Sequence, residues 1–244
     1  MNPALGSSIR LCWLLLAAVS LCAQTAQVLE TKVITPSEEP YAGWPTVARR
    51  ANGELWVSWS GGRDGHICPF GQVRAMTSKD DGATWTWLSE IPTRPGDDVK
   101  KGYHELFALE TDDGRIVLQI RNHNKPEVGE TFQCESADGG RTWTVPKPIG
   151  VWGLPSHLLK LRDGRLVMTY GYRRKPFGNQ ARISADQGRT WSEPLTISAD
   201  GEAGDLGYPS TVELADGTLL TVWYEFQKAA GKAVLRQAKW KVSK

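Results

Sequence analysis

The stretch Ser136-Ala-Asp138-Gly-Gly140-Arg-Thr142-Trp143 decides the fold, because its pattern Ser-x-Asp-x-Gly-x-Thr-Trp recurs at residues 78–85 and 184–191. Asp and Ser side chains bond nearby backbone groups and fix a turn, and Gly supplies a positive φ. Thr and Trp suit the strand that follows, where the Trp ring covers the turn. The pattern therefore predicts a structural staple of a β-hairpin. The alternative is a calcium loop, but the regular series of oxygen ligands and the late Glu of such loops are absent.

A second repeated signal lies between these stretches. Asn-Gly or Asp-Gly between apolar runs marks a tight hairpin, and it occurs at Gly53, Gly114, Gly164 and Gly217. The spacing of fifty to sixty residues fits a propeller blade of four short strands. We expect blades over roughly 41–92, 101–148, 152–198 and 206–241, and a strand around 28–34 that completes the last one. The predicted fold is an all-β propeller with four or five blades.

The first residues are typical of an export signal. Arg10 precedes an apolar run over residues 11–21, and small residues follow around Cys22. This run is too short to span a bilayer. We expect a signal peptide over residues 1–23, a propeller domain over 27–244 without a transmembrane segment, and a secreted or periplasmic protein.

Charge and cysteine content exclude several classes of partner. The 29 Lys and Arg residues nearly balance 27 Asp and Glu residues, and without a basic cluster we expect no nucleic-acid partner. Cys68 and Cys134 remain outside the signal, either as a disulfide in an oxidising compartment or as two buried thiols. The spacing offers no metal pattern, and we expect no cofactor.

Aligning the repeats on their hairpin glycines isolates one position in each blade. Nine residues before each Gly stand Trp44, Glu105, Pro155 and Tyr208. Equivalent positions in a propeller point toward the same end of the central channel, so Glu105 and Tyr208 should approach each other there. A carboxylate beside a phenol takes its proton and makes it a better nucleophile. The alternative is that Tyr208 packs and Glu105 is solvated.

The three Ser-x-Asp-x-Gly-x-Thr-Trp stretches resemble the Asp box, or BNR repeat, of sialidases, and the match extends over nearly the whole predicted domain. It includes the segments 43–46, 60–63, 66–71, 154–159, 170–173 and 205–210. The resemblance implies a sialidase-like β-propeller that is shortened, because sialidases have six blades and only residues 90–102 separate the first two blades here. It also implies an exo-glycosidase that removes terminal sialic acid or another acidic sugar from a glycan or glycoconjugate, with Tyr208 as nucleophile and Glu105 as its base.

The same resemblance implies residues that bind the substrate. Arg121, one hairpin after Glu105, resembles a member of the arginine triad that holds the sugar carboxylate, although a salt bridge with Glu105 is the alternative. Glu225 resembles the Glu that orients a triad arginine, and Arg173 lies near the place of another. Gly43 stands where sialidases carry the first triad arginine.

The acid/base residue of sialidases lies on a loop after the first inner strand. Asp64 and His66 are the titratable candidates at that distance, and either titrates usefully if partly buried; the alternative is a solvated loop. Because fold alone does not decide function, two further hypotheses stay open. The chain is either a non-catalytic propeller that binds carbohydrate or protein, such as a decayed enzyme, or a truncated product that folds poorly.

Overall fold

Antiparallel strands make up the regular structure of this protein. The computed structural model describes residues 27, 29–62, 64, 72–97, 102–229 and 231–242. These residues form fifteen strands and no helix, and the strands are grouped in four antiparallel sheets. The prediction of an all-β protein is therefore confirmed.

Each sheet is one blade, and the four blades follow one another along the chain. Blade I contains β1 (Gly43–Arg49), β2 (Leu55–Gly61), β3 (Gln72–Ser78) and β4 (Thr86–Glu90). Blade II contains β5 (Tyr103–Glu110), β6 (Ile116–Asn122), β7 (Glu130–Ser136) and β8 (Lys147–Trp152). Blade III contains β9 (Ser156–Lys160), β10 (Leu166–Tyr172), β11 (Phe177–Ser184) and β12 (Leu195–Gly201). Blade IV contains β13 (Leu206–Glu213), β14 (Leu219–Gln227) and β15 (Lys232–Trp240).

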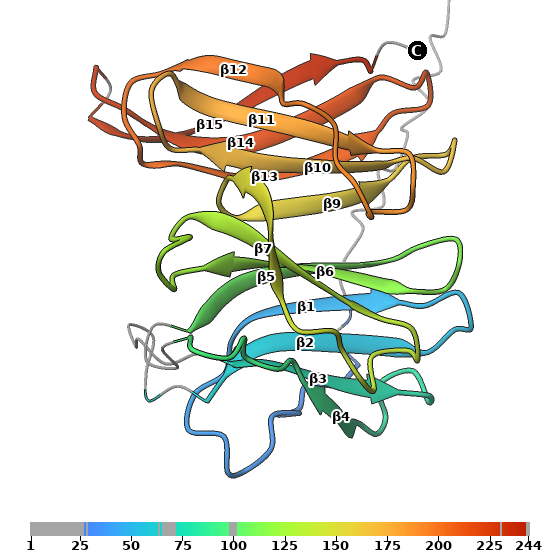
Figure 1. Cartoon of the computed structure of the whole chain (residues 1–244). Coiled ribbons are helices and arrows are strands. Elements are labelled where there is room, and N and C mark those ends of the chain that lie inside the picture. The colour runs from blue at the N-terminus through green and yellow to red at the C-terminus, as the bar shows by residue number, and fades with distance from the viewer. Residues whose placement is uncertain are drawn as a thin grey trace, which may run out of the picture. The chain divides into compact units, whose positions relative to one another are not determined.

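The blade count falls at the lower end of the prediction. Four blades form, with boundaries within a few residues of those expected, in a sialidase-like β-propeller arrangement (Figure 1). Blade IV has three strands, and residues 29–34 form no strand. The prediction that a strand around 28–34 completes the last blade is wrong for the described residues 29–34, which do not join β13, β14 and β15 in the sheet of blade IV.

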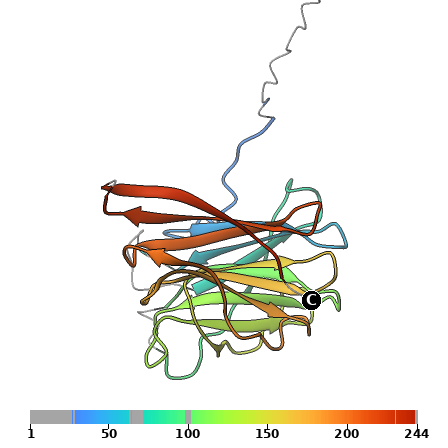
Figure 2. The ribbon, with the colours of Figure 1, turned by 90° about the horizontal axis from the view of Figure 1, so that it is seen from above.

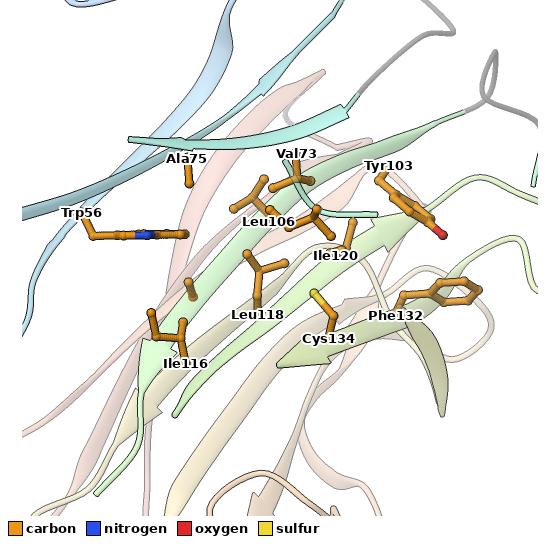
Figure 3. Close-up of a cluster of buried hydrophobic side chains, with 12 residues drawn as sticks. Trp56, Val73, Ala75, Tyr103, Leu106, Ile116, Leu118, Ile120, Phe132 and Cys134 are labelled. Atoms are coloured by element: carbon orange, nitrogen blue, oxygen red, sulfur yellow. The ribbon is translucent and has the colours of Figure 1, made fainter. Parts of the chain in front are cut away.

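Neighbouring blades pack through their sheet faces, and each interface has its own apolar cluster. Between blades I and II, Trp56 and Ala75 meet Leu106, Leu118 and the buried free thiol of Cys134 (Figure 3). Val117 and Met168 belong to the cluster between blades II and III, and Val167 and Leu219 to that between blades III and IV. The blades are therefore held together by hydrophobic burial along the order of the chain.

The first and last blades both carry exposed apolar side chains. Val47 on β1 is 64% exposed and Val212 on β13 is 51% exposed. Seen from above, the red strands β14 and β15 lie at the border of the ribbon (Figure 2), and Leu235 on β15 is exposed. Blade IV thus leaves apolar side chains exposed, whereas Val57, Trp59 and Met76 of blade I form a buried cluster against which Ile34 packs.

The strand register separates the two ends of every blade. Gly43 pairs with Ser60 and Gly61 with Gln72, so these residues share one end of blade I. Leu55 pairs with Ser78 at the other end, where the hairpin glycine and the Asp box lie. Blades II and III repeat this order through the pairs Ile116–Ser136 and Leu166–Ser184. The Asp boxes therefore lie at the end opposite to Trp44 and its equivalents.

The Asp boxes are hydrogen-bonded staples. In the second box the Asp138 carboxylate accepts the backbone N–H of Arg141 at 3.0 Å and of Thr142 at 2.9 Å, and the Thr142 hydroxyl at 2.6 Å. The Ser136 hydroxyl donates to the same carboxylate at 2.8 Å and accepts the Gly140 N–H at 2.7 Å. The other two boxes repeat this network. Internal donors thus occupy the Asp oxygens, which confirms the structural interpretation of the motif.

The box tryptophans connect one blade to the next. The indole N–H of Trp143, from blade II, donates to the Ser89 hydroxyl of blade I at 3.0 Å. That of Trp191, from blade III, donates to the Gln133 side chain of blade II at 3.2 Å. The repeated motif therefore fixes both the turn within a blade and the spacing between blades.

Several predictions fall on residues outside the described part of the chain. These are the signal peptide over residues 1–23 and the side chains of His66 and Cys68, while Cys134 itself is a buried free thiol. Residues 34–244 form one compact unit, separate from residues 1–33. Among the residues that the structure describes, no helix has the length and hydropathy needed to cross a bilayer.

Candidate active site

A pocket at the mouth of the blades collects one repeat position from all four sheets. Trp44, Glu105, Pro155 and Tyr208 line this cavity of about 280 Å³. They come from the start of β1, β5 and β13 and from the residue before β9. The prediction that the aligned repeat positions meet at one end of the channel is therefore confirmed.

Tyr208, Glu105 and Arg121 form one hydrogen-bonded cluster in this pocket. The Tyr208 hydroxyl donates a short hydrogen bond to the Glu105 carboxylate, across from blade IV to blade II. Arg121 Nη1 donates to both carboxylate oxygens, at 3.1 and 3.3 Å, and lies 3.5 Å from the Tyr208 hydroxyl. Both the predicted approach of Glu105 to Tyr208 and the alternative role of Arg121 as an ion-pair partner are present together.

The surroundings hold this cluster in one protonation state. Burial raises the pKa of Glu105, but the nearby Arg121 charge and the Tyr208 hydrogen bond outweigh it, and the net pKa lies below the usual value. Burial, the hydrogen bond to Glu105 and the Glu105 charge together raise the pKa of Tyr208. At neutral pH the pair is therefore a carboxylate and a neutral phenol, which is the state in which the first accepts a proton from the second.

Irregular strands aim these side chains into the pocket. The pairing of β13 with β14 shifts register between Gly207 and Ser210, and that of β5 with β6 shifts between Tyr103 and Leu106. Such bulges redirect a side chain that a regular strand would turn elsewhere. Tyr208 consequently has a φ of 52° and remains 43% exposed at the mouth.

Arg173 is the second guanidinium beside Tyr208. Its Nε donates to the Leu206 carbonyl at 2.8 Å, and its Cζ lies 5.9 Å from the centre of the Tyr208 ring. Two arginines close to Arg173 in the sequence make other contacts, since Arg174 stacks over Trp152 and Arg182 donates to Ser192 and Tyr170. The structure thus brings Arg173, together with Arg121, to the mouth.

Glu225 occupies a different environment from the pocket. It is 2% exposed, and its carboxylate accepts the Trp223 indole N–H and Arg236 Nη1, each at 2.8 Å. Arg236 also makes two 3.0 Å contacts to Asp200 on β12 of blade III. Glu225 therefore orients an arginine, but that arginine joins blades III and IV and is not among the residues that line the pocket.

The first-triad position is filled by a ring. A Cβ added to Gly43 would lie 2.9 Å from Tyr41 Cε1, so the Tyr41 side chain occupies the space into which a longer residue would project. Asp64 is exposed and follows Gly62 at the pocket end of blade I. His66 lies outside the described residues, so Asp64 is the one acid/base candidate that the structure places.

The pocket wall includes residues to which the repeat pattern had assigned no role. His157 and Phe107 line the pocket with their ring centroids 4.5 Å apart, and Trp44 lines it as well. Trp44 occupies the same position in its repeat as Glu105 and Tyr208 do in theirs. His157 lies two residues after Pro155, which occupies that position in blade III. The alignment of the repeats could therefore have identified both Trp44 and His157. Within the described residues, no group of three His, Cys, Asp or Glu side chains is arranged to hold a metal ion.

Comparisons with known proteins agree with this fold. Residues 100–221, half of the chain, match the family model described as a BNR repeat-like domain. A curated sialidase of Micromonospora viridifaciens is 25% identical over 140 residues, which are 52% of this chain and 21% of that protein. The chain thus spans about a fifth of the length of that curated relative.

Three solved structures illustrate the range of similar proteins. A protein of unknown function from Dyadobacter fermentans has 26% identity and a TM-score of 0.69, covering 81% of this chain and 52% of that one. The NanB sialidase of Streptococcus pneumoniae has 14% identity and a TM-score of 0.62, covering 87% and 53%. An α-L-arabinanase of Penicillium chrysogenum, solved with arabinobiose, has 18% identity and a TM-score of 0.60, covering 83% and 65%. This fold therefore occurs in glycoside hydrolases of more than one specificity.

Proposed function

The chain belongs to the BNR repeat-like domain family, and we propose from the geometry of its pocket that it is a glycoside hydrolase that removes a terminal acidic sugar, with sialic acid the first candidate. The observation that carries the proposal is the hydrogen bond from Tyr208 to Glu105, with Arg121 in contact with both. A nucleophile and a base within hydrogen-bond reach, with the base held by a third group, form the usual arrangement for covalent catalysis.

The proposed reaction has two steps. Tyr208 Oη attacks the anomeric carbon while Glu105 takes its proton, and the bond to the leaving oxygen breaks as an acid protonates that oxygen. Water then attacks the anomeric carbon of the glycosyl-tyrosine and gives a proton to the conjugate base of that acid. The bond between that carbon and Tyr208 Oη breaks, the sugar is released, and Glu105 returns its proton to Tyr208. We propose Asp64 or His66 as the acid, since the loop between β2 and β3 begins at the pocket end of blade I.

Charge and size support an acidic terminal sugar. Arg121 and Arg173 both flank Tyr208, and guanidinium groups hold carboxylates well. A neutral phenol approaches an anionic sugar without the repulsion that a carboxylate nucleophile would meet. The cavity of about 280 Å³ lies near the lower end of the range for ligand pockets, which suits a single sugar ring at the end of a glycan.

One observation favours a second function, that of a non-catalytic glycan-binding propeller. The Tyr41 ring stands beside Gly43, so the Gly43 position supplies no arginine to hold the sugar carboxylate. A hydrogen bond of this charge-assisted kind contributes roughly 1.5–3 kcal/mol, or about one to two decades in affinity. We therefore expect weak turnover of a simple aryl sialoside.

The decisive experiment traps the covalent intermediate. The protein would be incubated with a fluorinated sialyl fluoride, whose fast leaving group and slow hydrolysis cause the glycosyl-enzyme to accumulate, and then digested for mass spectrometry. We expect the adduct on the peptide that carries Tyr208, and no adduct or turnover in Tyr208→Phe. Tyr172→Phe, a change on β10 outside the cluster, is the matched control. Binding of sialyllactose without adduct or turnover would favour the binding function instead.

The site of action is also a proposal. We propose that the protein works outside the cytoplasm, supported by the charged and apolar pattern of residues 1–23. Amino-terminal sequencing of the protein after expression in an exporting host should find cleavage between Cys22 and Ala26. An uncleaved amino terminus in the cytoplasmic fraction would contradict it.

A further inference from the structure

Trp44 shares a strained backbone conformation with the proposed nucleophile. Both Trp44 and Tyr208 have a φ of 52°. The other non-glycine residues with positive φ in the described chain, Asp81 and Gln187, belong to the turns of Asp boxes. A bulky residue in this region is a rare outlier, and the conformation destabilises the folded backbone. Strain of this kind is retained where the surrounding structure or a function requires it.

The strain at Trp44 has the same structural origin as that at Tyr208. The pairing of β1 with β2 shifts register between Gly43 and Thr46, as the pairing of β13 with β14 does around Tyr208. In both strands the bulge places an aromatic side chain in the lining of the same pocket. Trp44 packs on one side beside the Tyr41 ring, with 6.4 Å between the ring centroids, but it remains only partly buried, so part of the indole is accessible to a ligand.

The pocket around Trp44 combines apolar walls with a few polar groups. Pro45, Phe107 and Pro209 contribute apolar surface. His157 lines the same cavity, and its Nδ1 is buried without a hydrogen-bond partner. Burial lowers the pKa of His157 to about 4, so the ring is neutral at pH 7 and offers one donor and one acceptor. Flat apolar surface with a few hydroxyl-binding groups matches the two faces of a sugar ring.

We propose that Trp44 is the platform on which the terminal sugar ring stacks, and that His157 hydrogen-bonds a hydroxyl or amide of that sugar. Trp44 thereby determines how the anomeric carbon is presented to Tyr208, although it takes no part in bond breaking. The inference rests on the proposed function in placing the sugar in this pocket, but it concerns binding and holds whether or not the bound glycoside is cleaved.

The test uses the strain to separate binding from folding. Trp44→Gly removes the indole and relieves the backbone, since Gly adopts a φ of 52° freely. We expect its melting temperature to equal or exceed that of the parent, while KM for an aryl sialoside rises at least tenfold. Trp44→Phe keeps an aromatic face and should restore KM to within about threefold. Trp87→Phe, a change to a half-exposed indole on β4, is the matched control.

Binding is also measured without turnover. Titration of sialyllactose into the Tyr208→Phe protein, with and without Trp44→Gly, should show at least a tenfold loss of affinity in the double variant. If KM and affinity in the Trp44→Gly variants stay within twofold of those of the matching proteins with Trp44, the platform is overturned and the hydrolase proposal stays intact. The same holds if Trp44→Gly lowers the melting temperature and leaves KM unchanged. Loss of turnover in Tyr208→Phe with affinity still dependent on Trp44 supports both. A parent protein without adduct or turnover whose glycan affinity depends on Trp44 supports the platform alone. Absence of any glycan binding overturns both.

Discussion

Replacing Glu105 by Gln should make Tyr208 easier to ionise and yet make the enzyme slower. The carboxylate of Glu105 accepts the Tyr208 proton in a hydrogen bond and places a negative charge beside it. Both effects stabilise the neutral phenol, so their removal lowers the pKa of Tyr208. Arg121, no longer paired with a carboxylate, then lies 3.5 Å from the phenol oxygen and stabilises the phenolate further.

The size of this effect follows from the contacts. A hydrogen bond to a charged group contributes about 1.5–3 kcal/mol, which corresponds to about one to two in pKa. Tyr208 is 43% exposed, so solvent screens part of the charge, and the lower end of the range applies. We therefore expect the pKa of Tyr208 to fall by about one in Glu105→Gln. Loss of the general base should reduce kcat by about 10²- to 10⁴-fold.

The assay is an ultraviolet titration of phenolate absorbance at alkaline pH, with circular dichroism at each step to verify that the fold persists. Six tyrosines contribute, so the difference between Glu105→Gln and the double variant with Tyr208→Phe isolates the one of interest. The same difference for the parent gives the reference. An unchanged or higher pKa in Glu105→Gln would refute the proposed coupling, and full turnover would show that another group takes the proton.

Three further predictions concern stability and geometry. Asp138→Ala removes four hydrogen bonds at the surface, which together contribute about 2 kcal/mol to the free energy of unfolding after allowance for solvent. Calorimetry should therefore show a melting temperature about 4–8 °C lower with unchanged KM, and an altered KM would contradict the separation of Asp138 from the pocket. Hydrogen bonds from Thr84 lower the pKa of Asp80 to about 2. The stability that this lowered pKa provides is complete above the pKa of Asp in the unfolded chain, about 4, and is lost as the pH falls below it. Melting temperatures should therefore fall as the pH drops from about 4 to 2, and a constant melting temperature over that range would contradict this. Gly207→Ala should reduce turnover at least tenfold, because the added Cβ would lie 3.2 Å from the Leu154 carbonyl oxygen beside Tyr208. Gly217→Ala should lower only the melting temperature, because Gly217 also has a positive φ but no atom lies within 4 Å of the added Cβ. Equal turnover in the two variants would contradict the role of the Gly207 contact.

The sequence was sufficient to predict the meeting of Glu105 and Tyr208, although 103 residues separate them. In a repeat protein, residues that stand the same number of positions before the hairpin glycine occupy equivalent places in their blades. Arg121 followed in the same way, because one hairpin after Glu105 returns the chain to the same end. Local turn chemistry thus determined long-range geometry once the period was known.

Other features depended on contacts that no local pattern records. Glu225 occupies a strand position at the pocket end, yet Arg236 and Trp223 turn its carboxylate into the interface between blades. The strain at Trp44 arises from a bulge, which depends on how two strands pair and not on either strand alone. The absence of a strand over residues 29–34 likewise depends on partners, since one edge strand is stable only beside another.

The position of Tyr208 depends on how closely blades III and IV approach each other. A Cβ added to Gly207 would lie 3.2 Å from the Leu154 carbonyl oxygen and 3.3 Å from Gly171 Cα. One added to Gly171 would lie 2.8 Å from the same carbonyl oxygen. Two glycines are therefore needed for backbone to meet backbone at the mouth, immediately before Tyr208. Because Glu105 belongs to blade II, its distance from Tyr208 is set through blade III, so the proposed chemistry depends on packing as much as on the reacting groups themselves.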